Sequence, residues 1–469
     1  MKLFYFFLLV MLSALNANGQ IYFNDVYNIG LNQGATSMVV DTGYVVIGQE
    51  ITSNYRSFKL MKINLNGDTI WTRNFPKNQF AYYTGSSNSL IKTNDHNYVF
   101  GGTLINLQDT TNGGDCLLVK FNNNGDTLWT KNYGGQGTEF ANATIQTLDS
   151  GYALLGSTTS FGNGQFDFYL VKTDYLGTFE WQQTFGTSGQ EKAYSIIRTL
   201  DGGFLLSGSQ NNQFFIVKTN AQGNLDWQQV YLGTSGPCYV TQLADSTYVL
   251  SGAKAISGFL GEAFLIKISK TGGEIWHNHY GSVSGNDWFT TAPLILNDGS
   301  IVIGGQQMNG SIPYGMLVKT DCTGNQQWIR TYYANPNIDN YLNDLKSTSD
   351  TGLIFCGQAF STLTDFWVVR IDSNGCEYVG CNVGIEELGV DGGEIEIYPN
   401  PTTNEFTIEN SQLRINAIHI YNVLGEEVLK LERIANSEKA IDISTWKAGV
   451  YFVEVETEKG VVRKKVVKE

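Results

Sequence analysis

Three acidic residues occupy the same place in a repeated stretch of the sequence. Glu139, Glu191 and Asp287 each stand two positions after the last glycine of a glycine-rich loop. If these carboxylates met in a ring, they could coordinate a cation such as Ca²⁺ or accept hydrogen bonds from sugar hydroxyls. The alternative is that each acid accepts hydrogen bonds from backbone amides of its own loop. The candidate ligand-binding residues are these acids, one adjacent aromatic residue and two acids that close long loops: Glu139, Glu191, Asp287, Trp288, Asp115 and Asp167.

No catalytic machinery is recognisable in the sequence. His277 and His279 alternate along one expected strand and could contact one metal ion, but the chain holds only two other histidines, His96 and His419. A third ligand is not apparent, so we expect no metal site at these histidines. There is no G-x-S-x-G elbow, phosphate-cradling glycine loop or H-E-x-x-H helix. We assign no catalytic residue and no cofactor beyond the possible Ca²⁺, although a pair of loop carboxylates for glycoside hydrolysis stays open.

The elements that must position these residues belong to a repeat with seven copies. One phrase of the repeat ends in tryptophan six times and has Tyr378 near that place in the seventh copy. A second phrase, apolar and closed by glycine, precedes each of them, as in GYALLG and GFLLSG. Each unit has the composition of four short strands, and no segment keeps a helical period. The recurring tryptophans are Trp71, Trp129, Trp181, Trp227, Trp276 and Trp328.

Two tight turns recur along the repeat. In one of them Asn, Asp or Ser is followed three residues later by glycine, as in Asp174 and Gly177, which is the chemistry of a bulged hairpin loop. The other turn contains Asp and Gly, as in 149–151. In the register that we expect, each tryptophan faces an apolar partner and each lysine faces an acid. The expected partners are Trp129 with Val119, Trp181 with Val171, Trp227 with Val217, Lys172 with Glu180 and Lys218 with Asp226.

A basic residue recurs at the same position of every unit. Cross-strand pairing explains this column more simply than ligand binding does, because the column has the period of the repeat itself. Its members are Lys62, Lys120, Lys172, Lys218, Lys267, Lys319 and Arg370.

Four antiparallel strands in a repeat of about 50 residues are typical of a β-propeller blade. The fold class that we predict is all-β, with a seven-bladed β-propeller over 20–383 and a small C-terminal β-sandwich (Ig-like) domain. The last repeat ends after its third strand, and the early segment IYFNDVYNIG reads as an unpartnered fourth strand. Pairing the two would close the ring and remove its open edges. An open β-solenoid and two stacked sandwiches are the alternatives.

The longer connections of the repeat are expected on one face of the ring. Strand direction alternates, so the two tight turns of each blade fall on the opposite face. Binding residues are more often found on long loops that a rigid scaffold positions. We therefore expect function on the face that carries the loops 103–115, 157–167, 253–262 and 306–314.

Composition and the N-terminus indicate an exported protein. A net charge of −14 argues against nucleic acid as a partner, since phosphates call for a clustered basic surface. Residues 1–19 have the basic start, short apolar core and small-residue end of a signal peptide, with cleavage expected before Gln20. No later segment has the roughly 20 apolar residues of a transmembrane helix. The six cysteines are too few for a disulfide scaffold, although Cys376 and Cys381 are close enough in sequence to form a bridge.

The repeat gives way to a different kind of sequence near the C-terminus. An acidic, glycine-rich linker at 384–393 leads into short alternating strands with a Pro-Asn-Pro turn, a YNVLG block, a GVYFV block and a basic end. These blocks, in this order over 394–469, resemble the type IX secretion C-terminal sorting domain of Bacteroidetes. The resemblance implies recognition by the outer-membrane translocon, export to the cell surface or medium, and either release or attachment to surface lipopolysaccharide. The motif positions are Pro399, Asn400, Pro401, Gly425, Gly449 and Tyr451.

The sorting domain does not reveal what the exported part does. Our leading hypothesis is a non-catalytic propeller that binds a glycan or a protein ligand through its long-loop face. The alternative is an extracellular polysaccharide-active hydrolase that uses loop carboxylates. A purely structural role in a surface layer is a third possibility, which predicts neither binding nor turnover.

Overall fold

The computed structural model divides the chain into two compact units, Met1–Glu377 and Tyr378–Glu469. It describes residues 21–377 and 395–468, with gaps at 31–32, 52–55, 76–79, 109–112, 212, 233–235, 256–260, 282–286, 361–362, 411–414, 423–426, 433–437 and 458–459. All regular elements within the described residues are β-strands. The expected signal peptide, the linker, Gly425 and Cys381 lie outside the described residues.

The strands of the first unit form seven antiparallel sheets among the described residues, which we number 1 to 7 along the chain. Sheet 1 contains β2 (Gln33–Val40), β3 (Tyr44–Ile51), β4 (Arg56–Ile63) and β5 (Thr69–Asn74). Sheet 2 contains β6 (Phe80–Thr84), β7 (Leu90–Lys92), β8 (Tyr98–Asn106), β9 (Asp115–Phe121) and β10 (Thr127–Tyr133). Sheet 3 contains β11 (Glu139–Gln146), β12 (Tyr152–Thr158), β13 (Asp167–Thr173) and β14 (Phe179–Phe185). Sheet 4 contains β15 (Glu191–Arg198), β16 (Phe204–Gln210), β17 (Gln213–Thr219) and β18 (Leu225–Leu232).

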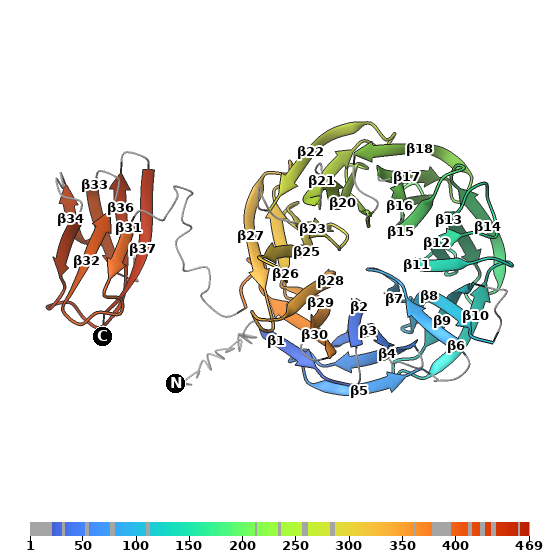
Figure 1. Ribbon diagram of the computed structural model, residues 1–469, viewed down its shortest axis with the longest axis horizontal. Helices are drawn as coiled ribbons and strands as arrows, with labels where there is room; N and C mark the ends of the chain where they lie inside the picture. The colour runs from blue at the N-terminus through green and yellow to red at the C-terminus, as the bar shows by residue number, and fades with distance from the viewer. Residues whose placement is uncertain are drawn as a thin grey trace, which may run out of the picture. The chain divides into compact units, whose positions relative to one another are not determined.

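The remaining three sheets complete the unit. Sheet 5 contains β19 (Tyr239–Gln242), β20 (Tyr248–Ala255), β21 (Gly261–Ile268) and β22 (Glu274–Tyr280). Sheet 6 contains β23 (Trp288–Phe289), β24 (Leu294–Ile295), β25 (Ile301–Asn309), β26 (Ile312–Thr320) and β27 (Gln326–Tyr332). Sheet 7 contains β28 (Asp339–Ser347), β29 (Leu353–Phe360), β30 (Thr364–Ile371) and, from the start of the chain, β1 (Phe23–Tyr27). Figure 1 shows the sheets arranged around a ring, with strands such as β11 and β15 toward the centre and β14 and β18 on the rim.

The core of this unit lies between neighbouring sheets. The two middle strands of sheet 3, β12 and β13, are buried along their whole length. Phe168 of sheet 3 packs against Phe215 of sheet 4, with ring centroids 5.0 Å apart. A buried side chain of this size stabilises the fold by about 1.5–3 kcal/mol. Because both faces of a sheet are apolar, each sheet needs a neighbour on either side.

Strand β1, from the start of the chain, completes sheet 7 and joins it to its neighbour, sheet 1. β1 pairs antiparallel with β30, in a register that runs from Phe23 opposite Arg370 to Tyr27 opposite Phe366. The Tyr27 hydroxyl donates a hydrogen bond of 2.7 Å to the carbonyl of Gly67 in sheet 1. The outer strands of other sheets make the same bond to the next sheet, as Tyr133 does to Gly177 at 2.6 Å. The borrowed strand therefore joins sheet 7 to sheet 1 in the way that neighbouring sheets are joined elsewhere.

The hairpin turns have the expected chemistry, but the register beyond them differs from the prediction. The Asp174 carboxylate accepts hydrogen bonds from the backbone of Leu176 at 2.8 Å and Thr178 at 2.7 Å, and Gly177 has a φ of +75°. A bulge follows, so that Trp181 lies opposite Lys172 rather than Val171. The corresponding predictions were wrong in the same way, because Trp129 faces Lys120 and Trp227 faces Lys218. The extra residue of the bulge shifts each tryptophan by one position.

The basic column is held by ion pairs. Lys172 contacts Glu180 at 2.8 Å despite the shifted register, and it also contacts Asp149 of the other tight turn at 2.8 Å. Lys218 repeats this arrangement with Asp226 at 3.2 Å and Asp201 at 3.0 Å. Burial raises the pKa of Asp149, but hydrogen bonds from Lys172 and Thr147 outweigh it and lower the pKa to about 2. The column thus stabilises the turns, as the periodicity indicated.

A break in the inner strand of sheet 2 brings a short segment into contact with three other sheets. The Ser87 hydroxyl donates to Asp344 of sheet 7 at 2.8 Å, and the Ser86 amide donates to the Asn142 carbonyl of sheet 3 at 2.9 Å. The Leu90 amide donates to Ser37 of sheet 1 at 3.3 Å. Asp344 is 1% exposed and also accepts a hydrogen bond of 3.0 Å from Ser37. Residues 85–89 therefore tie together inner strands that are distant in sequence.

The second unit consists of two sheets that share one apolar core. The three-stranded sheet contains β31 (Ile395–Tyr398), β32 (Glu405–Asn410) and β35 (Glu438–Asp442). The four-stranded sheet contains β33 (Ile415–Asn422), β34 (Glu427–Glu432), β36 (Gly449–Thr457) and β37 (Gly460–Lys468). The Asn400 side chain donates to the Lys465 carbonyl at 2.6 Å and accepts from the Val467 amide at 2.9 Å. The Pro-Asn-Pro turn thereby holds the basic last strand, while Tyr451 donates to the Lys447 carbonyl at 2.8 Å.

Glu377 gives the closure of the ring a pH dependence. Its carboxylate accepts a hydrogen bond of 2.6 Å from Asn24 of β1, and Asn24 accepts one of 2.7 Å from the Trp367 indole. Burial raises the pKa of Glu377, although the Asn24 hydrogen bond lowers it in part. Because the folded state binds this proton more tightly, the ionised carboxylate costs stability above the folded pKa. The cost falls as the pH drops from the folded pKa toward the unfolded value of about 4.3.

We expect Glu377→Gln to raise the free energy of unfolding at pH 7.5, since glutamine keeps the acceptor for Asn24 without a buried charge. The advantage over the wild-type protein should shrink at pH 5, where the carboxyl is closer to its protonated form. Chemical denaturation at both pH values measures the difference. Asp126→Asn, a change at an exposed turn position, is the matched control. An advantage that is equal at both pH values would contradict the assignment.

Candidate functional site

The three acids predicted from the sequence are buried at the starts of inner strands. Glu139, Glu191 and Asp287 are each 0% exposed. Glu139 accepts hydrogen bonds from the Gly135 amide at 2.8 Å and the Thr158 hydroxyl at 2.6 Å. Its carboxylate thus organises the loop that precedes β11, as the structural alternative proposed.

The other two acids lie in equivalent surroundings. Glu191 accepts from the Thr187 hydroxyl at 2.8 Å and the Gln210 amide at 2.7 Å. Asp287 accepts from the Met308 amide at 3.2 Å. These acids belong to different sheets. Glu139 and Glu191 bond to the loops before their own strands, and Asp287 bonds to β25. No group of three or more His, Cys, Asp or Glu side chains that could hold a metal occurs among the described residues.

Two further predicted residues, Asp115 and Asp167, lie close to Glu139 and Glu191. Asp115 accepts from the Asn132 amide at 2.6 Å, and Asp167, which is 1% exposed, accepts from the Asn163 amide at 2.9 Å. A Cβ placed on Gly134 would lie 2.3 Å from Asp115 and 2.5 Å from Glu139, so glycine is required where the two carboxylates approach. Gly186 has the same relation to Asp167 and Glu191, at 1.9 and 2.6 Å.

Two predicted features lie apart from these carboxylate pairs. Trp288 is half-buried in β23 and pairs with Gln306 of β25. His277 and His279 lie on the outer strand of sheet 5, where His277 contacts Glu274 at 2.7 Å and His279 contacts Glu262 at 2.8 Å. Both imidazoles pack against the Phe264 ring. Contacts with Glu274 and Glu262 and packing on Phe264 position these histidines.

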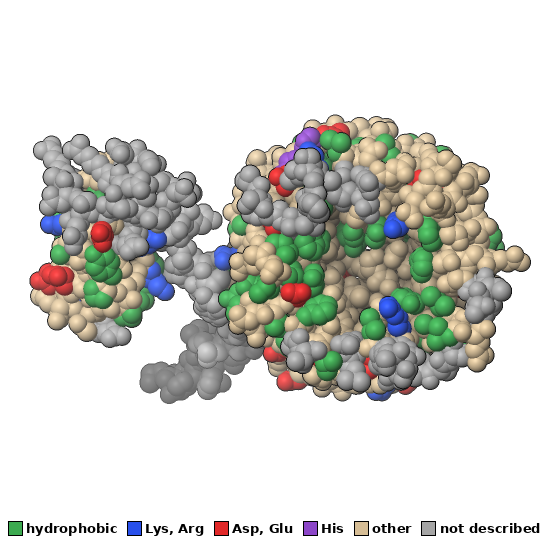
Figure 2. Space-filling view, in the orientation of Figure 1, with side chains coloured by type: hydrophobic (Ala, Val, Ile, Leu, Met, Phe, Trp, Pro, Cys, Tyr) green, Lys and Arg blue, Asp and Glu red, His purple; other side chains and the backbone are tan. Residues whose placement is uncertain are grey.

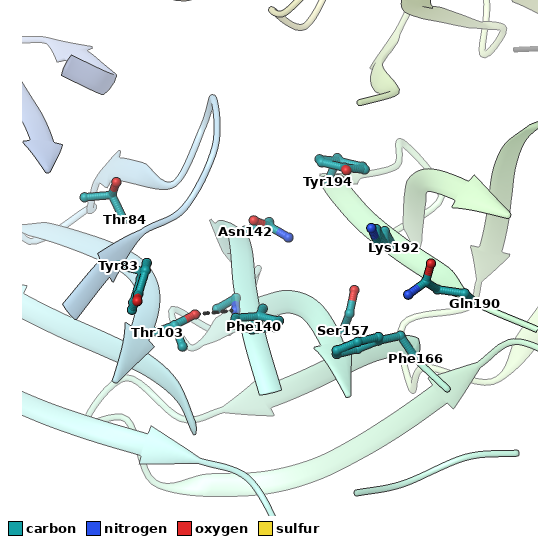
Figure 3. A pocket seen from close by; sticks show the side chains of 11 residues that line it. Tyr83, Thr84, Thr103, Phe140, Asn142, Ser157, Phe166, Gln190, Lys192 and Tyr194 are labelled. Carbon is teal, nitrogen blue, oxygen red and sulfur yellow. Dashed lines mark hydrogen bonds between the residues drawn. The ribbon is translucent and has the colours of Figure 1, made fainter. Parts of the chain in front are cut away.

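A pocket of about 410 Å³ lies between the inner strands of sheets 2, 3 and 4. This volume is within the range of small-molecule sites. Figure 2 shows one face of the ring hollowed at its centre, with hydrophobic side chains around the hollow. In Figure 3, Tyr83 and Lys192 lie on opposite sides of Phe140. The lining residues are Tyr83, Thr84, Thr103, Phe140, Ala141, Asn142, Ser157, Phe166, Gln190, Lys192 and Tyr194.

Strand alternation aims these side chains into the pocket. Successive residues of a strand point to opposite faces, so the neighbours of the buried acids face the other way. Glu139 is buried whereas Phe140 is 37% exposed, and Glu191 is buried whereas Lys192 is exposed. The Phe140 and Phe166 rings lie 5.9 Å apart with an interplanar angle of 31°. They offer an aromatic surface at the level of the loops that were expected to carry function.

Hydrogen bonds between sheets hold the pocket walls in place. The Ala141 amide donates to the Thr103 hydroxyl at 3.1 Å, which joins sheet 3 to sheet 2 (Figure 3). Ala193 of sheet 4 donates its amide to Ser157 at 3.0 Å and accepts from the Asn142 amide at 2.7 Å. A ligand therefore meets a largely preformed site, which lowers the entropy cost of binding.

The pocket is aromatic and polar, and the only charged group in its described lining is a cation. Lys192 supplies a positive charge, and the lining contains no Asp or Glu. The guanidinium of Arg56 lies 4.9 Å from the centroid of the Tyr83 ring, a cation–π contact. Burial raises the pKa of the Tyr194 phenol, which stays protonated at neutral pH and can donate a hydrogen bond. The arrangement can stack a ring-shaped ligand and hydrogen-bond its hydroxyls.

The sequence reasoning did not identify the pocket residues, although the repeat contains a signal for them. Phe140 of sheet 3, Lys192 of sheet 4 and Gly34 of sheet 1 each follow the first residue of an inner strand. The residue two positions later differs as well, being Asn142 or Tyr194. The scaffold does not fix the residue type at positions that differ between copies. Such positions can therefore vary to suit a function.

The strands define an all-β repeat protein with a separate β-rich unit at its C-terminus. Residues 396–469 match the secretion system C-terminal sorting domain. The protein therefore carries a type IX secretion sorting domain, which directs export to the cell surface or the extracellular space. Among the described residues, no helix has the length and apolar composition that a membrane crossing requires.

Similarity to characterised proteins is otherwise partial. An endo-acting ulvan lyase of Formosa agariphila is 28% identical over 78 residues, which make up 16% of this chain and 15% of that protein. The solved polysaccharide lyase Uly1 has a TM-score of 0.45 at 9% identity, covering 77% of this chain and 94% of its own. The WD40 domain of Neurospora crassa Pan2 has a TM-score of 0.43 at 9% identity, covering 71% and 88%. Likeness at this level transfers no activity.

We expect Glu191→Ala to lower the free energy of unfolding by about 2 kcal/mol, because donors on Thr187 and Gln210 lose their acceptor. Glu274→Ala, which removes an acid that is 44% exposed, should change it by about 0.5 kcal/mol or less. Denaturant titration of the two variants measures both values. Equal small effects would show that the buried carboxylate does not organise its loop.

Proposed function

We propose that this protein is a secreted or surface-displayed binding protein that takes a glycan into the pocket between sheets 2, 3 and 4. The observation that carries the proposal is the pairing of aromatic surfaces with hydrogen-bonding groups in one cavity. Sugar rings present apolar faces to aromatic side chains and hydroxyls to polar ones. Phe140 and Phe166 supply the first kind of surface, while Asn142, Gln190 and Tyr194 supply the second.

The finer architecture belongs to the same proposal. We infer a seven-bladed β-propeller over 20–383, joined by the linker 384–393 to an Ig-like sorting domain over 394–469. The seven sheets and the pairing of β1 with β30 support the blade count. We also infer that residues 1–19 are removed as a signal peptide. The sorting domain would then be removed on export, and the protein would be either released or attached to surface lipopolysaccharide.

Turnover of a polysaccharide is the second candidate function. The name of the ulvan lyase relative favours it, although the match covers 16% of this chain. The pocket is lined by the phenols of Tyr83 and Tyr194 and the ammonium group of Lys192, which can exchange protons with a substrate. A hydrolase built on Glu139 and Glu191 is less favoured, because both carboxylates are buried and engaged with their loops. Glu139→Gln and Glu191→Gln should therefore leave any turnover largely intact.

The double variant Phe140→Ala, Tyr194→Ala should weaken glycan binding at least about tenfold, since it removes one stacking surface and one hydrogen-bonding phenol. Titration calorimetry of the full chain against a panel of soluble oligosaccharides measures the affinity, and product analysis of the same mixtures detects turnover. Phe179→Ala, which removes an aromatic side chain that is 50% exposed on an outer strand, is the matched control. Binding that survives the double variant would place the ligand elsewhere, and failure of every sugar to bind would refute the proposal.

A further inference from the structure

We propose that the pocket selects glycans that carry negative charge on the sugar, as a carboxylate or a sulfate. This inference rests on the glycan-binding function proposed above and names the class of ligand. It starts from Lys192, which lines the pocket on the inner strand of sheet 4. The backbone of Lys192 pairs with Ser209 of β16, so its position along the strand is fixed.

Lys192 differs from the lysines of the repeated column. Most of those lysines are buried, and they pair with acids, as Lys172 does with Asp149 and Glu180. Lys192 is exposed and forms no ion pair within the part of the chain that the structure describes. Its ammonium group can accordingly meet an incoming anion without displacing a protein partner.

A second cation lies behind the opposite wall of the pocket. The Arg56 guanidinium stacks on Tyr83, and Tyr83 lines the pocket on the side away from Lys192 (Figure 3). Arg56 does not line the pocket itself, so it can add positive charge only through its position at the Tyr83 ring. Lys192 is the cation that a ligand can contact directly.

The acids near the pocket do not cancel this charge. Glu139 and Glu191 are the sequence neighbours of Phe140 and Lys192, yet both are 0% exposed and point to the other face of their strands. Loop amides, hydroxyls and the Gln210 side chain satisfy their oxygens. The pocket is therefore a locally basic site in a chain whose net charge is −14.

The chemistry of the pocket also limits the ligand. Asn142 donates one hydrogen bond to the Ala193 carbonyl, and the Ser157 and Thr103 hydroxyls accept from backbone amides. Lys192, Gln190 and Tyr194 are further lining groups that can donate. All three are donors when Tyr194 is protonated, and a carboxylate or sulfate accepts several donors at once. A neutral sugar would leave the ammonium of Lys192 without a charged partner.

The test compares charged and neutral oligosaccharides on the full chain. Oligogalacturonate carries carboxylates, oligosaccharides of a sulfated galactan carry sulfates, and cello-oligosaccharides are neutral. We expect one of the charged ligands to bind at least about tenfold more tightly than the neutral one, and Lys192→Gln to remove about tenfold of that affinity. Lys270→Gln, at an exposed lysine in a hairpin turn, should have no effect. Raising the salt concentration should weaken the charged complex more than a neutral one.

The outcomes separate this inference from the function on which it rests. If neutral and charged sugars bind equally and Lys192→Gln changes neither, charge selection is refuted while glycan binding stands. If no sugar of any kind binds, both fail. A fold that is intact by circular dichroism in Lys192→Gln, with charged ligand lost and Lys270→Gln unaffected, supports the inference. A difference between the carboxylated and the sulfated ligand identifies which anion the pocket takes.

Discussion

The packing of apolar sheets against one another is the constraint on which the rest of this structure depends. The middle strands of a sheet such as β12 and β13 are buried on both faces, so a sheet with one bare face would expose a large apolar surface. A row of such sheets has two bare ends, and a ring has none. β1 supplies the last strand of sheet 7 and carries Tyr27, whose bond to Gly67 repeats the bond between other neighbours. The pairing of β1 with β30 thus satisfies a requirement that no single repeat can meet.

Residues that repeat between copies and residues that differ between copies lie on opposite faces of the same inner strands. Glu139 and Glu191 point into the protein and serve the scaffold in equivalent ways, whereas Phe140 and Lys192 point into the pocket and differ. A repeated position must satisfy the same neighbours in every sheet, so it has little freedom to change. A position that faces the pocket has no such partner in the next copy. Asymmetry in an otherwise regular ring is therefore where a specific ligand site can form.

Much of the fold could be predicted because its determinants are local. Turn residues such as Asp174 and Gly177 act within a few positions, and the tryptophan spacing marks each unit. The register beyond the turns could not be predicted, because one bulged residue moves Trp181 from Val171 to Lys172. The contacts of residues 85–89 depend on strands far away in sequence, including Asp344 of sheet 7. The pocket could not be predicted for a related reason. Glu139 is charged and recurs between copies, whereas its exposed neighbour Phe140, which lines the pocket, varies.

The distribution of charge separates residues that stabilise the scaffold from residues that are available to a ligand. Each lysine of the repeated column is matched by an acid of a tight turn, so these charges stabilise the hairpins and offer little to a ligand. The loop acids are likewise consumed by backbone amides and hydroxyls. Among the described residues that line the pocket, the Lys192 ammonium group forms no ion pair, and the Arg56 guanidinium stacks on Tyr83, another lining residue. The net charge of the protein is −14, so the cation at the pocket gives anions a local attraction that the chain as a whole does not. The sorting domain directs export of the chain. Under the proposed function, the positive charge at the pocket would then select among the glycans that the exported protein meets.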